Sequence, residues 1–215
     1  MSRLRAMLLV AVPALIGFAG ITIGLATGIL IGIDRSIADG HRIGALYWPA
    51  RVGFSLGQNW VFPTASAVVA ALLAVRKRTP WPVLGLIGSW LAHTLVVGSA
   101  KIWAGRPPPA GGDPHLHAVA AELSQRMSYP SGHAANIVVF SATLGVLLAA
   151  YTGNPRWASR MQTVGGVSAL ICVVCMVYLN FHWTTDALGG LVLGIAIRAL
   201  VVPFCERISS TPVRG

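Results

Sequence analysis

The residues Pro130-Ser131-Gly132-His133 stand directly ahead of a run of mostly apolar residues that continues to Tyr151, and this junction decides the fold. A run of about 20 apolar residues is long enough to cross a bilayer as a helix. We therefore expect Ser131 to cap a membrane helix, since serine side chains accept hydrogen bonds from the first free N–H groups of a helix. The positive end of such a helix favours an anion such as phosphate.

Composition extends this interpretation to the whole chain. Hydrophobic residues make up 55% and charged residues only 10% of the 215 residues. With a mean hydropathy of +0.70, these values are typical of an integral membrane protein. The fold class predicted is all-α, a polytopic membrane protein in which residues 1–215 form a single integral membrane domain. We expect six transmembrane helices, with five as an alternative because the second and fifth segments are short. The segments are Met7 to Ile33, Trp60 to Val75, Val83 to Trp103, His133 to Tyr151, Val164 to Leu179 and Ala187 to Val202.

The net charge of +10 would suggest a nucleic-acid partner in a soluble protein, but here its distribution among the loops matters more. If the N-terminus lies inside, the cytoplasmic side receives nine basic residues, or ten with Arg198, and the other side receives six. The nine are Arg3, Arg5, Arg76, Lys77, Arg78, Arg156, Arg160, Arg207 and Arg214. The positive-inside rule then predicts a multi-pass cell-membrane protein with both termini in the cytoplasm. No nucleic-acid partner is expected.

The outer loop between the third and fourth spans is rich in proline and glycine at its start. It ends in His115 to Gln125, a stretch that predicts a short helix on the membrane surface. His115 and His117 form a His-x-His pair without a carboxylate or cysteine at ligand spacing, so we expect no metal there. The three cysteines lie in or beside apolar segments and imply neither a disulfide framework nor a zinc site.

A second polar string lies about fifty residues beyond the first. Asp186 follows His182 by four positions, which places both side chains on one face if a helix has begun there. Near neutral pH a histidine serves as nucleophile or as proton donor, and a guanidinium such as that of Arg106 suits a phosphoryl group. The residues therefore indicate phosphoryl transfer through a phosphohistidine. Simpler interpretations remain open: His182 as an interfacial polar group, Asp186 as a favourable charge at a helix start, and Arg106 as a headgroup anchor.

These strings together resemble the type 2 phosphatidic acid phosphatase (PAP2) superfamily. The resemblance covers about residues 101–186 and rests on three motifs: Arg106-Pro107, Pro130-Ser131-Gly132-His133, and Tyr178-Leu179-x-x-His182-x-x-x-Asp186. It implies a six-helix bundle with a metal-free site and no cofactor. It also implies that His182 attacks phosphorus, that Asp186 orients its ring, and that His133 protonates the leaving alkoxide. Ser131, the Gly132 backbone and Arg106 would then bind the equatorial oxygens of the phosphoryl group.

The first departure from the family pattern concerns a lysine. The family has a lysine seven residues before the arginine of the first motif, but Ser99 stands there and Lys101 follows two positions later. On an unbroken helix this shift rotates a side chain by about 200°. If the loop between this lysine and Arg106 is two residues shorter than in the family and bends at Gly105, the lysine side chain again points toward the site. Lys101 is therefore kept as a candidate phosphate ligand.

The second departure concerns an arginine. The family has Ser-Arg six to seven residues before the nucleophilic histidine, and Cys175 and Met176 occupy those positions. Losing one preorganised charged donor typically costs about 3 to 4 kcal/mol of transition-state stabilisation. The outer loops offer three possible replacements, Arg42, Arg51 and Arg126.

Three functions fit these residues. The first is a lipid-phosphate or polyprenyl-(di)phosphate phosphatase that acts at the outer membrane face, with a phosphotransferase as a close variant. The second is a prenyl-diphosphate enzyme, whose long substrate would use grooves left by Gly189-Gly190 and Gly194. The third is a catalytically weak member that binds an anionic lipid. In each case the partners are a lipid phosphate and the membrane, while the oligomeric state stays open.

Overall fold

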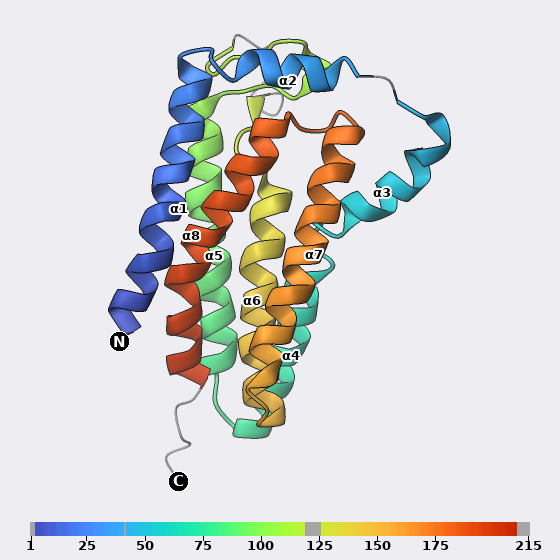
Figure 1. Cartoon of the computed structure of the whole chain (residues 1–215). Helices are drawn as coiled ribbons and strands as arrows, with labels where there is room; N and C mark the ends of the chain where they lie inside the picture. The colour runs from blue at the N-terminus through green and yellow to red at the C-terminus, as the bar shows by residue number, and fades with distance from the viewer. Residues whose placement is uncertain (1–2, 41, 119–125, 210–215) are drawn as a thin grey trace.

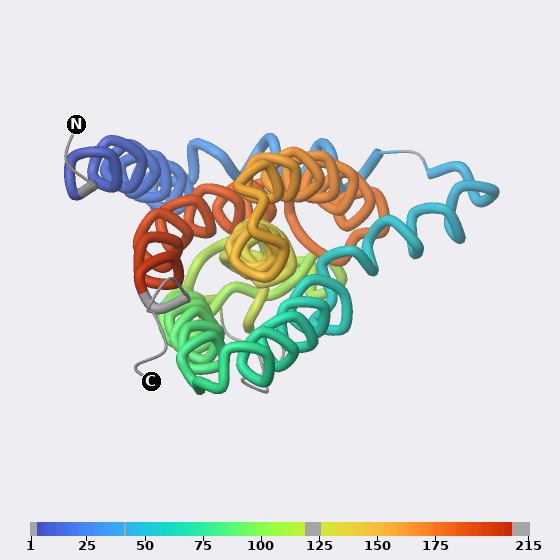
Figure 2. Tube along the Cα trace, turned by 90° about the horizontal axis from the view of Figure 1, so that it is seen from below, coloured from blue at the N-terminus to red at the C-terminus, as the bar shows by residue number. Residues whose placement is uncertain are grey.

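Helix α6 (Gly132–Thr152) forms the centre of the molecule and is buried along its first two thirds. The computed structural model describes residues 3–40, 42–118 and 126–209. Seen along the bundle axis, α6 is surrounded by the other long helices, and α1 lies outside α8 (Figure 2). The helices around α6 are α4 (Phe62–Lys77), α5 (Trp81–Ala104), α7 (Arg156–Tyr178) and α8 (Thr184–Ser209), and the outer helix α1 spans Arg3–Ala26.

The described helices confirm the predicted all-α membrane fold. Five of them, α1, α5, α6, α7 and α8, are long and apolar enough to cross a membrane. The second predicted span, Trp60 to Val75, corresponds to α4 (Phe62–Lys77), whose 16 residues fall short of that length, in line with the expectation that this segment is short. The fifth predicted segment was expected to be short, but α7 has 23 residues because the helix already begins at Arg156.

The first predicted span is wrong at its outer end. The expected segment ran without a break from Met7 to Ile33, but α1 ends at Ala26 and a separate helix α2 (Ile31–Ala38) follows. Gly28 lies between them with φ +78°, a left-handed conformation that only glycine adopts at little cost. As a result α2 lies across the end of the bundle (Figure 1).

Three short elements lie in the loops. The helix α3 (Tyr47–Ser55), preceded by the 3-10 turn η1 (Gly44–Leu46), projects to the side of the bundle and contacts α7 (Figure 1), and the 3-10 turn η2 (Pro109–Gly111) follows α5. Of the predicted surface helix from His115 to Gln125, residues 115–118 form a bend and turn, and residues 119–125 lie outside the described part. Helices α6 and α8 both begin at the end of the bundle where α2 lies, whereas the two chain termini lie toward the other end (Figure 1).

Glycines on α8 set its distance from α6. A Cβ atom added to Gly190 would lie 2.2 Å from the Ser131 carbonyl oxygen, and one on Gly194 would lie 2.9 Å from Ala135 Cα. Small residues of this kind let two membrane helices approach closely. The expectation that these glycines leave open grooves for a long substrate is therefore wrong, because the neighbouring helix fills the space. The close approach brings the start of α8 against the start of α6.

Candidate active site

A cavity of about 400 Å³ lies at the end of the bundle where α6 and α8 begin. Its wall includes four of the residues expected from the sequence, Lys101, Gly132, His133 and His182. The rings of His133 and His182 lie edge-on to each other in this wall, with centroids 5.9 Å apart and an angle of 67° between their planes. Segments far apart in sequence thus meet at one cavity.

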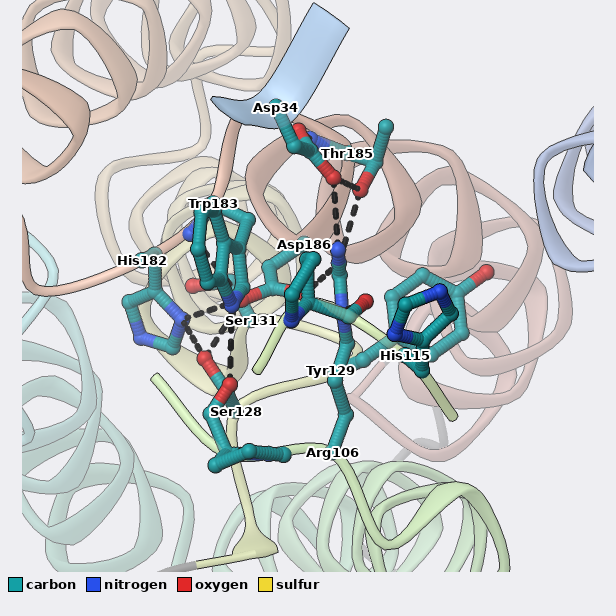
Figure 3. Close-up of polar contacts among 12 residues, drawn as sticks. Asp34, Arg106, His115, Ser128, Tyr129, Ser131, His182, Trp183, Thr185 and Asp186 are labelled. Atoms are coloured by element: carbon teal, nitrogen blue, oxygen red, sulfur yellow. Dashed lines mark hydrogen bonds and ion pairs between the residues drawn. The ribbon is translucent and has the colours of Figure 1, made fainter. Parts of the chain in front are cut away.

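His182 is held through its Nδ1 atom. This atom lies 3.1 Å from Ser128 Oγ and 3.4 Å from Asp186 Oδ2, and Ser128 Oγ in turn donates to the same carboxylate oxygen (Figure 3). The backbone N–H of Trp183 also donates to this oxygen, at 3.1 Å. A proton on Nδ1 suits this arrangement, since Ser128 Oγ can then accept from the ring while donating to Asp186. The Nε2 lone pair is thereby left for the cavity.

Ser128 was missed by the sequence analysis. It stands two residues before the second motif, in a segment whose local pattern predicts only a loop. Its side chain is almost fully buried between His182 and Asp186. No local pattern could reveal this role, because the contact depends on how the loop returns to the start of α8.

His133 occupies the first turn of α6, opposite the proposed nucleophile. Its ring also packs on Phe54, with centroids 4.5 Å apart. The segment after α3 approaches closely at Gly57, where a Cβ atom would lie 2.7 Å from His133 Cβ. Gly57 therefore allows this wall of the cavity to close around the imidazole.

Lys101 lies in the last turn of α5 and reaches the start of α6. Its ammonium donates to the carbonyl of Met127 and, at 3.4 Å, to that of Ser128. Its Cε atom lies 3.6 Å from the position that a Cβ on Gly132 would take. Of the lysines and arginines described in the structure, Lys101 is the one on the cavity wall. The left-handed Gly105 (φ +54°) ends α5 after this turn, as the proposed joint requires.

Arg106 takes a position different from that of the expected phosphate ligand. It is fully buried behind Asp186 and does not line the cavity. One terminal nitrogen lies 2.6 Å from Asp186 Oδ1 and 2.7 Å from Thr185 Oγ1, and the other lies 2.6 Å from Asp34 Oδ2. Its Nε donates to the Pro114 carbonyl at 2.7 Å. Because the chain turns at Gly105, the guanidinium of Arg106 lies next to the start of α8, where it pairs with the carboxylates of Asp186 and Asp34.

Asp34 is a second residue that the sequence did not reveal. It lies on α2 and is 1% exposed, so its charge needs partners. Besides Arg106, it accepts the backbone N–H of Thr185 at 3.0 Å and the Thr185 hydroxyl at 2.5 Å. Asp34 therefore joins α2 to the first turn of α8 (Figure 3). An acidic residue at the end of an apolar stretch was the available signal, but its partners lie more than seventy residues away.

The sequence model of the PAP2 superfamily matches residues 82–209. The chain belongs to the PAP2 superfamily.

Two curated proteins are similar to this PAP2 protein in part. Phosphatidylglycerophosphatase B of Bacillus subtilis (strain 168) is 33% identical over 82 residues, which cover 38% of this chain and 40% of that protein. An undecaprenyl-diphosphatase of Sulfolobus acidocaldarius is 35% identical over 75 residues, which cover 35% of this chain and 32% of that protein. The chain thus spans less than half the length of either relative.

The fold of the PAP2 protein is shared with a solved structure. The crystal structure of a transmembrane PAP2-type phosphatidylglycerolphosphate phosphatase from Bacillus subtilis matches with a TM-score of 0.74 and 23% identity. The match covers 92% of this chain and 96% of that chain. The family and the membrane fold predicted from the sequence are therefore confirmed.

The PAP2 protein differs from the family pattern beneath Ser131. The Ser131 side chain accepts from the backbone N–H of Ala134 at 3.5 Å, so it caps α6 as predicted. Its hydroxyl also lies 3.4 Å from the sulfur of Met176, which is fully buried. Met176 stands where the family has an arginine, so an apolar thioether lies beneath the serine instead of a cation. Ser131 itself is fully buried and does not line the cavity.

The three arginines considered as replacements do not line the cavity. Arg42 donates to the carbonyls of Tyr178 and Ala38, both at 2.7 Å. Arg51 stacks over the ring of Phe181, with its guanidinium carbon 5.3 Å from the centroid. In the described cavity the cationic contribution therefore comes from Lys101.

Tyr129 stabilises the packing next to the site. Its hydroxyl lies 2.7 Å from Thr22 Oγ1 on α1, and its ring stacks on Phe18 at 5.7 Å. Burial raises the pKa of Tyr129 to about 12, so the phenol is neutral at physiological pH. A Cβ on Gly189 would lie 2.6 Å from this ring. Tyr129 thus fills the space between α1 and the start of α8.

The His-x-His pair points in two directions. The His115 ring lies 2.7 Å from Asp113 Oδ1, a carboxylate that the sequence analysis did not count. Hydrogen bonds from His115 lower the pKa of Asp113. The His117 ring instead packs edge-on against Trp103, with centroids 5.3 Å apart. The two imidazoles therefore do not converge on one point.

Proposed function

We propose that this protein is a membrane phosphatase that removes phosphate from a lipid phosphate or a polyprenyl (di)phosphate. The observation that carries the proposal is the orientation of His182. Its Nδ1 atom is engaged by Ser128 and Asp186, and its ring lines the cavity edge-on to that of His133. The names of the two partial relatives, a phosphatidylglycerophosphatase and an undecaprenyl-diphosphatase, support the same substrate class.

The proposed reaction has two steps. In the first, the Nε2 lone pair of His182 attacks phosphorus, the phosphorus–oxygen bond to the lipid breaks, and His133 gives a proton to the leaving oxygen. In the second, His133 removes a proton from water, the water oxygen attacks phosphorus, and the phosphorus–nitrogen bond breaks. The products are the dephosphorylated lipid, inorganic phosphate and the original imidazole.

The other residues stabilise charge during both steps. Asp186, reached directly and through Ser128, favours the cationic state of the His182 ring that forms as nitrogen bonds to phosphorus. The ammonium of Lys101 and the backbone at the start of α6 lie beside the cavity, where they would neutralise the phosphoryl oxygens. Phosphoryl transfer depends mainly on such positioning and charge stabilisation, so the proposal needs no metal.

We place the site at the extracytoplasmic face, with both termini in the cytoplasm. The basic residues gather on the side of the termini, and the cavity lies at the opposite end of the bundle. A lipid substrate would keep its tail in the bilayer and present its phosphate at this end. Labelling of single cysteines introduced at Gln58 and Gly153, with a membrane-impermeant reagent on intact cells, tests this: Gln58→Cys should react and Gly153→Cys should not.

One observation favours the alternative of a catalytically weak lipid-binding protein. Met176, which stands at the position of an arginine in the family motif, is in contact with Ser131. If activity is absent, this substitution is the first structural reason to test. A phosphotransferase using the same site would release phosphate only with an acceptor alcohol.

The decisive experiment measures phosphate release by purified protein in detergent with EDTA. Phosphatidate, phosphatidylglycerophosphate and polyprenyl mono- and diphosphates are supplied to wild type and to His182→Ala. We expect release from at least one substrate by wild type and a loss of at least 1,000-fold in the variant, since nucleophile removal is of this order. A His115→Ala variant, which changes a histidine outside the cavity, should retain activity. No release from any substrate would contradict the proposal, and a loss of activity with EDTA would contradict a metal-free site.

A further inference from the structure

A second pocket, of about 240 Å³, lies between α6, α7 and α8. Its polar residues include Arg198 on α8 and Gln162 on α7. Arg198 lies twelve residues after Asp186, which is about 18 Å along the helix, so the pocket is separate from the proposed active site. Arg198 thus lies within a helix that is long and apolar enough to cross the membrane.

Arg198 has no protein partner in the described part of the chain. Neither it nor Gln162 makes a hydrogen bond, ion pair or stacking contact there, and Arg198 is half-buried rather than exposed. Arg207, near the end of α8, lies nine residues after Arg198, which is about 14 Å farther along the helix axis. The side chain of Arg198 is too short to cover this distance, so its guanidinium does not reach the end of the helix. A charged group at this depth is unfavourable unless something pairs with it.

The pocket has a polar end and an apolar end. Helix α7 runs away from the terminal side of the bundle, and α8 runs toward it. Gln162 and Arg198 are therefore the lining residues of these helices nearest the terminal side, and Leu170 and Leu191 are those farthest from it. This order matches a lipid whose phosphate lies near the terminal side and whose acyl chain extends toward the middle of the bilayer.

The neighbouring residues fit the same occupant. A Cβ atom on Gly166, which also lines the pocket, would meet no atom within 4 Å, so there is room for an acyl chain. Two turns before it on α7, exposed Arg160 stacks on Trp157 at 5.5 Å, an arrangement suited to the membrane interface. Basic residues at this level attract anionic lipids, and a guanidinium can bind a phosphate through two parallel hydrogen bonds.

We propose that this pocket binds an anionic phospholipid from the leaflet on the side of the termini, with Arg198 and Gln162 holding its phosphate. The site lies on the opposite side of the membrane from the catalytic cavity. A lipid held there bridges α7 and α8, the two helices that carry Met176 and Asp186. The proposal does not depend on catalytic activity.

The test compares lipid binding by the full-length wild type and by Arg198→Gln. Purified protein is titrated with phosphatidylglycerol or phosphatidylcholine, and bound lipid is counted by native mass spectrometry while the unfolding temperature is followed. We expect wild type to retain one more phosphatidylglycerol than the variant, with at least tenfold tighter binding than phosphatidylcholine. Phosphatidylglycerol should raise the unfolding temperature of wild type, and at least half of that rise should be lost in the variant.

Two further variants keep the test decisive. Arg156→Gln removes an exposed charge on the same side outside the pocket and should behave as wild type. Gly166→Leu leaves Arg198 in place and fills open space in the pocket, so the fold should be retained while the additional lipid is lost. If phosphatidylglycerol binds Arg198→Gln and Gly166→Leu as it binds wild type, or if wild type binds both lipids equally, the proposal is wrong.

Discussion

Arg106 donates a hydrogen bond of 2.6 Å to Asp186 at a position where neither side chain is exposed to solvent. Its other terminal nitrogen is paired equally closely with Asp34. One arginine thus joins two carboxylates, and the three groups carry one net negative charge next to His182. Because a negative charge favours a cationic imidazole, we expect Asp34 to influence the proposed reaction through Arg106 and Asp186 without touching the cavity.

The first prediction concerns Asp34→Asn. Without this negative charge, Arg106 neutralises Asp186 more completely, and the cationic ring that forms as His182 bonds to phosphorus is stabilised less. We expect kcat for phosphate release to fall by about tenfold, since one pairwise interaction of roughly 1.4 kcal/mol is removed.

Other titratable or charged groups face this site, and the Asp34→Asn variant leaves their side chains in place. They include Lys101 from α5, His133 from α6 and Arg106 from the loop. Asp39→Asn is the matched control, because Asp39 is an exposed carboxylate at the end of the same helix α2. A kcat of Asp34→Asn equal to that of wild type would show that Asp34 serves structure alone.

The second prediction concerns Ser128. Its hydroxyl contacts both His182 Nδ1 and the carboxylate of Asp186. The direct distance between His182 Nδ1 and Asp186 Oδ2 is longer, at 3.4 Å. Ser128→Ala should lower kcat by about 10- to 100-fold, consistent with leaving buried polar groups without a partner at a cost of roughly 1–3 kcal/mol. KM should change less than threefold, because Ser128 does not line the cavity.

A hydroxyl-retaining variant separates this role from packing. Ser128→Thr should recover most of the kcat lost in Ser128→Ala, whereas Ser36→Ala, at an exposed serine on α2, should have no effect. Equal activity of Ser128→Ala and wild type in steady-state phosphate release would show that the direct contact between His182 and Asp186 suffices.

Local patterns explain which features the sequence could predict. Hydropathy located the membrane helices. The expected pairing of His182 with Asp186 is present, but α8 begins only at Thr184, so the turn that leads into the helix joins the two residues and not a turn of the helix itself. The cap at Ser131 was predictable because its contact is local. Gly28 was not recognised as a helix break, since glycine is common inside membrane helices.

Long-range contacts explain what the sequence could not predict. Arg106 was assigned to phosphate because its residue type suits that anion, but two buried carboxylates suit it equally well. Choosing between them requires knowing that α2 folds back over the start of α8. Likewise, Gly190 indicated open space, although Ser131 fills that space. The residue type of Arg106 indicated that it binds an anion, but only the tertiary structure shows that this anion is a carboxylate of the protein.

The third prediction concerns Met176→Arg, which restores the residue type found in the family. The new guanidinium would be buried beside Ser131 without a carboxylate, so the variant should unfold at a lower temperature than wild type in buffer without phosphate. Adding inorganic phosphate should raise its unfolding temperature more steeply than that of wild type, since ligand binding to the folded state stabilises by mass action. Met176→Leu, which conserves volume, should show the phosphate dependence of wild type. If Met176→Arg responds to phosphate no more than Met176→Leu does, position 176 does not reach the phosphate.

The final prediction tests the close approach of α8 to α6. In Gly190→Ala the added methyl group would lie 2.2 Å from the Ser131 carbonyl oxygen, which is backbone and cannot rotate away. The start of α8 must then move away from α6, which disturbs the hydrogen bond of 2.9 Å from Ser131 N–H to the Asp186 carbonyl. We expect a loss of about 1–3 kcal/mol in stability, as for other overpacked sites, together with a larger fractional loss of phosphate release.

Gly20→Ala is the matched control for this prediction, because a Cβ atom on Gly20 in α1 would meet nothing within 4 Å. Alanine favours the helix over glycine by about 1 kcal/mol, so this control should unfold at the same or a higher temperature. Thermal unfolding in detergent and phosphate release are measured on both variants. If Gly190→Ala matches Gly20→Ala in both measurements, contact between α6 and α8 at Ser131 does not position the site.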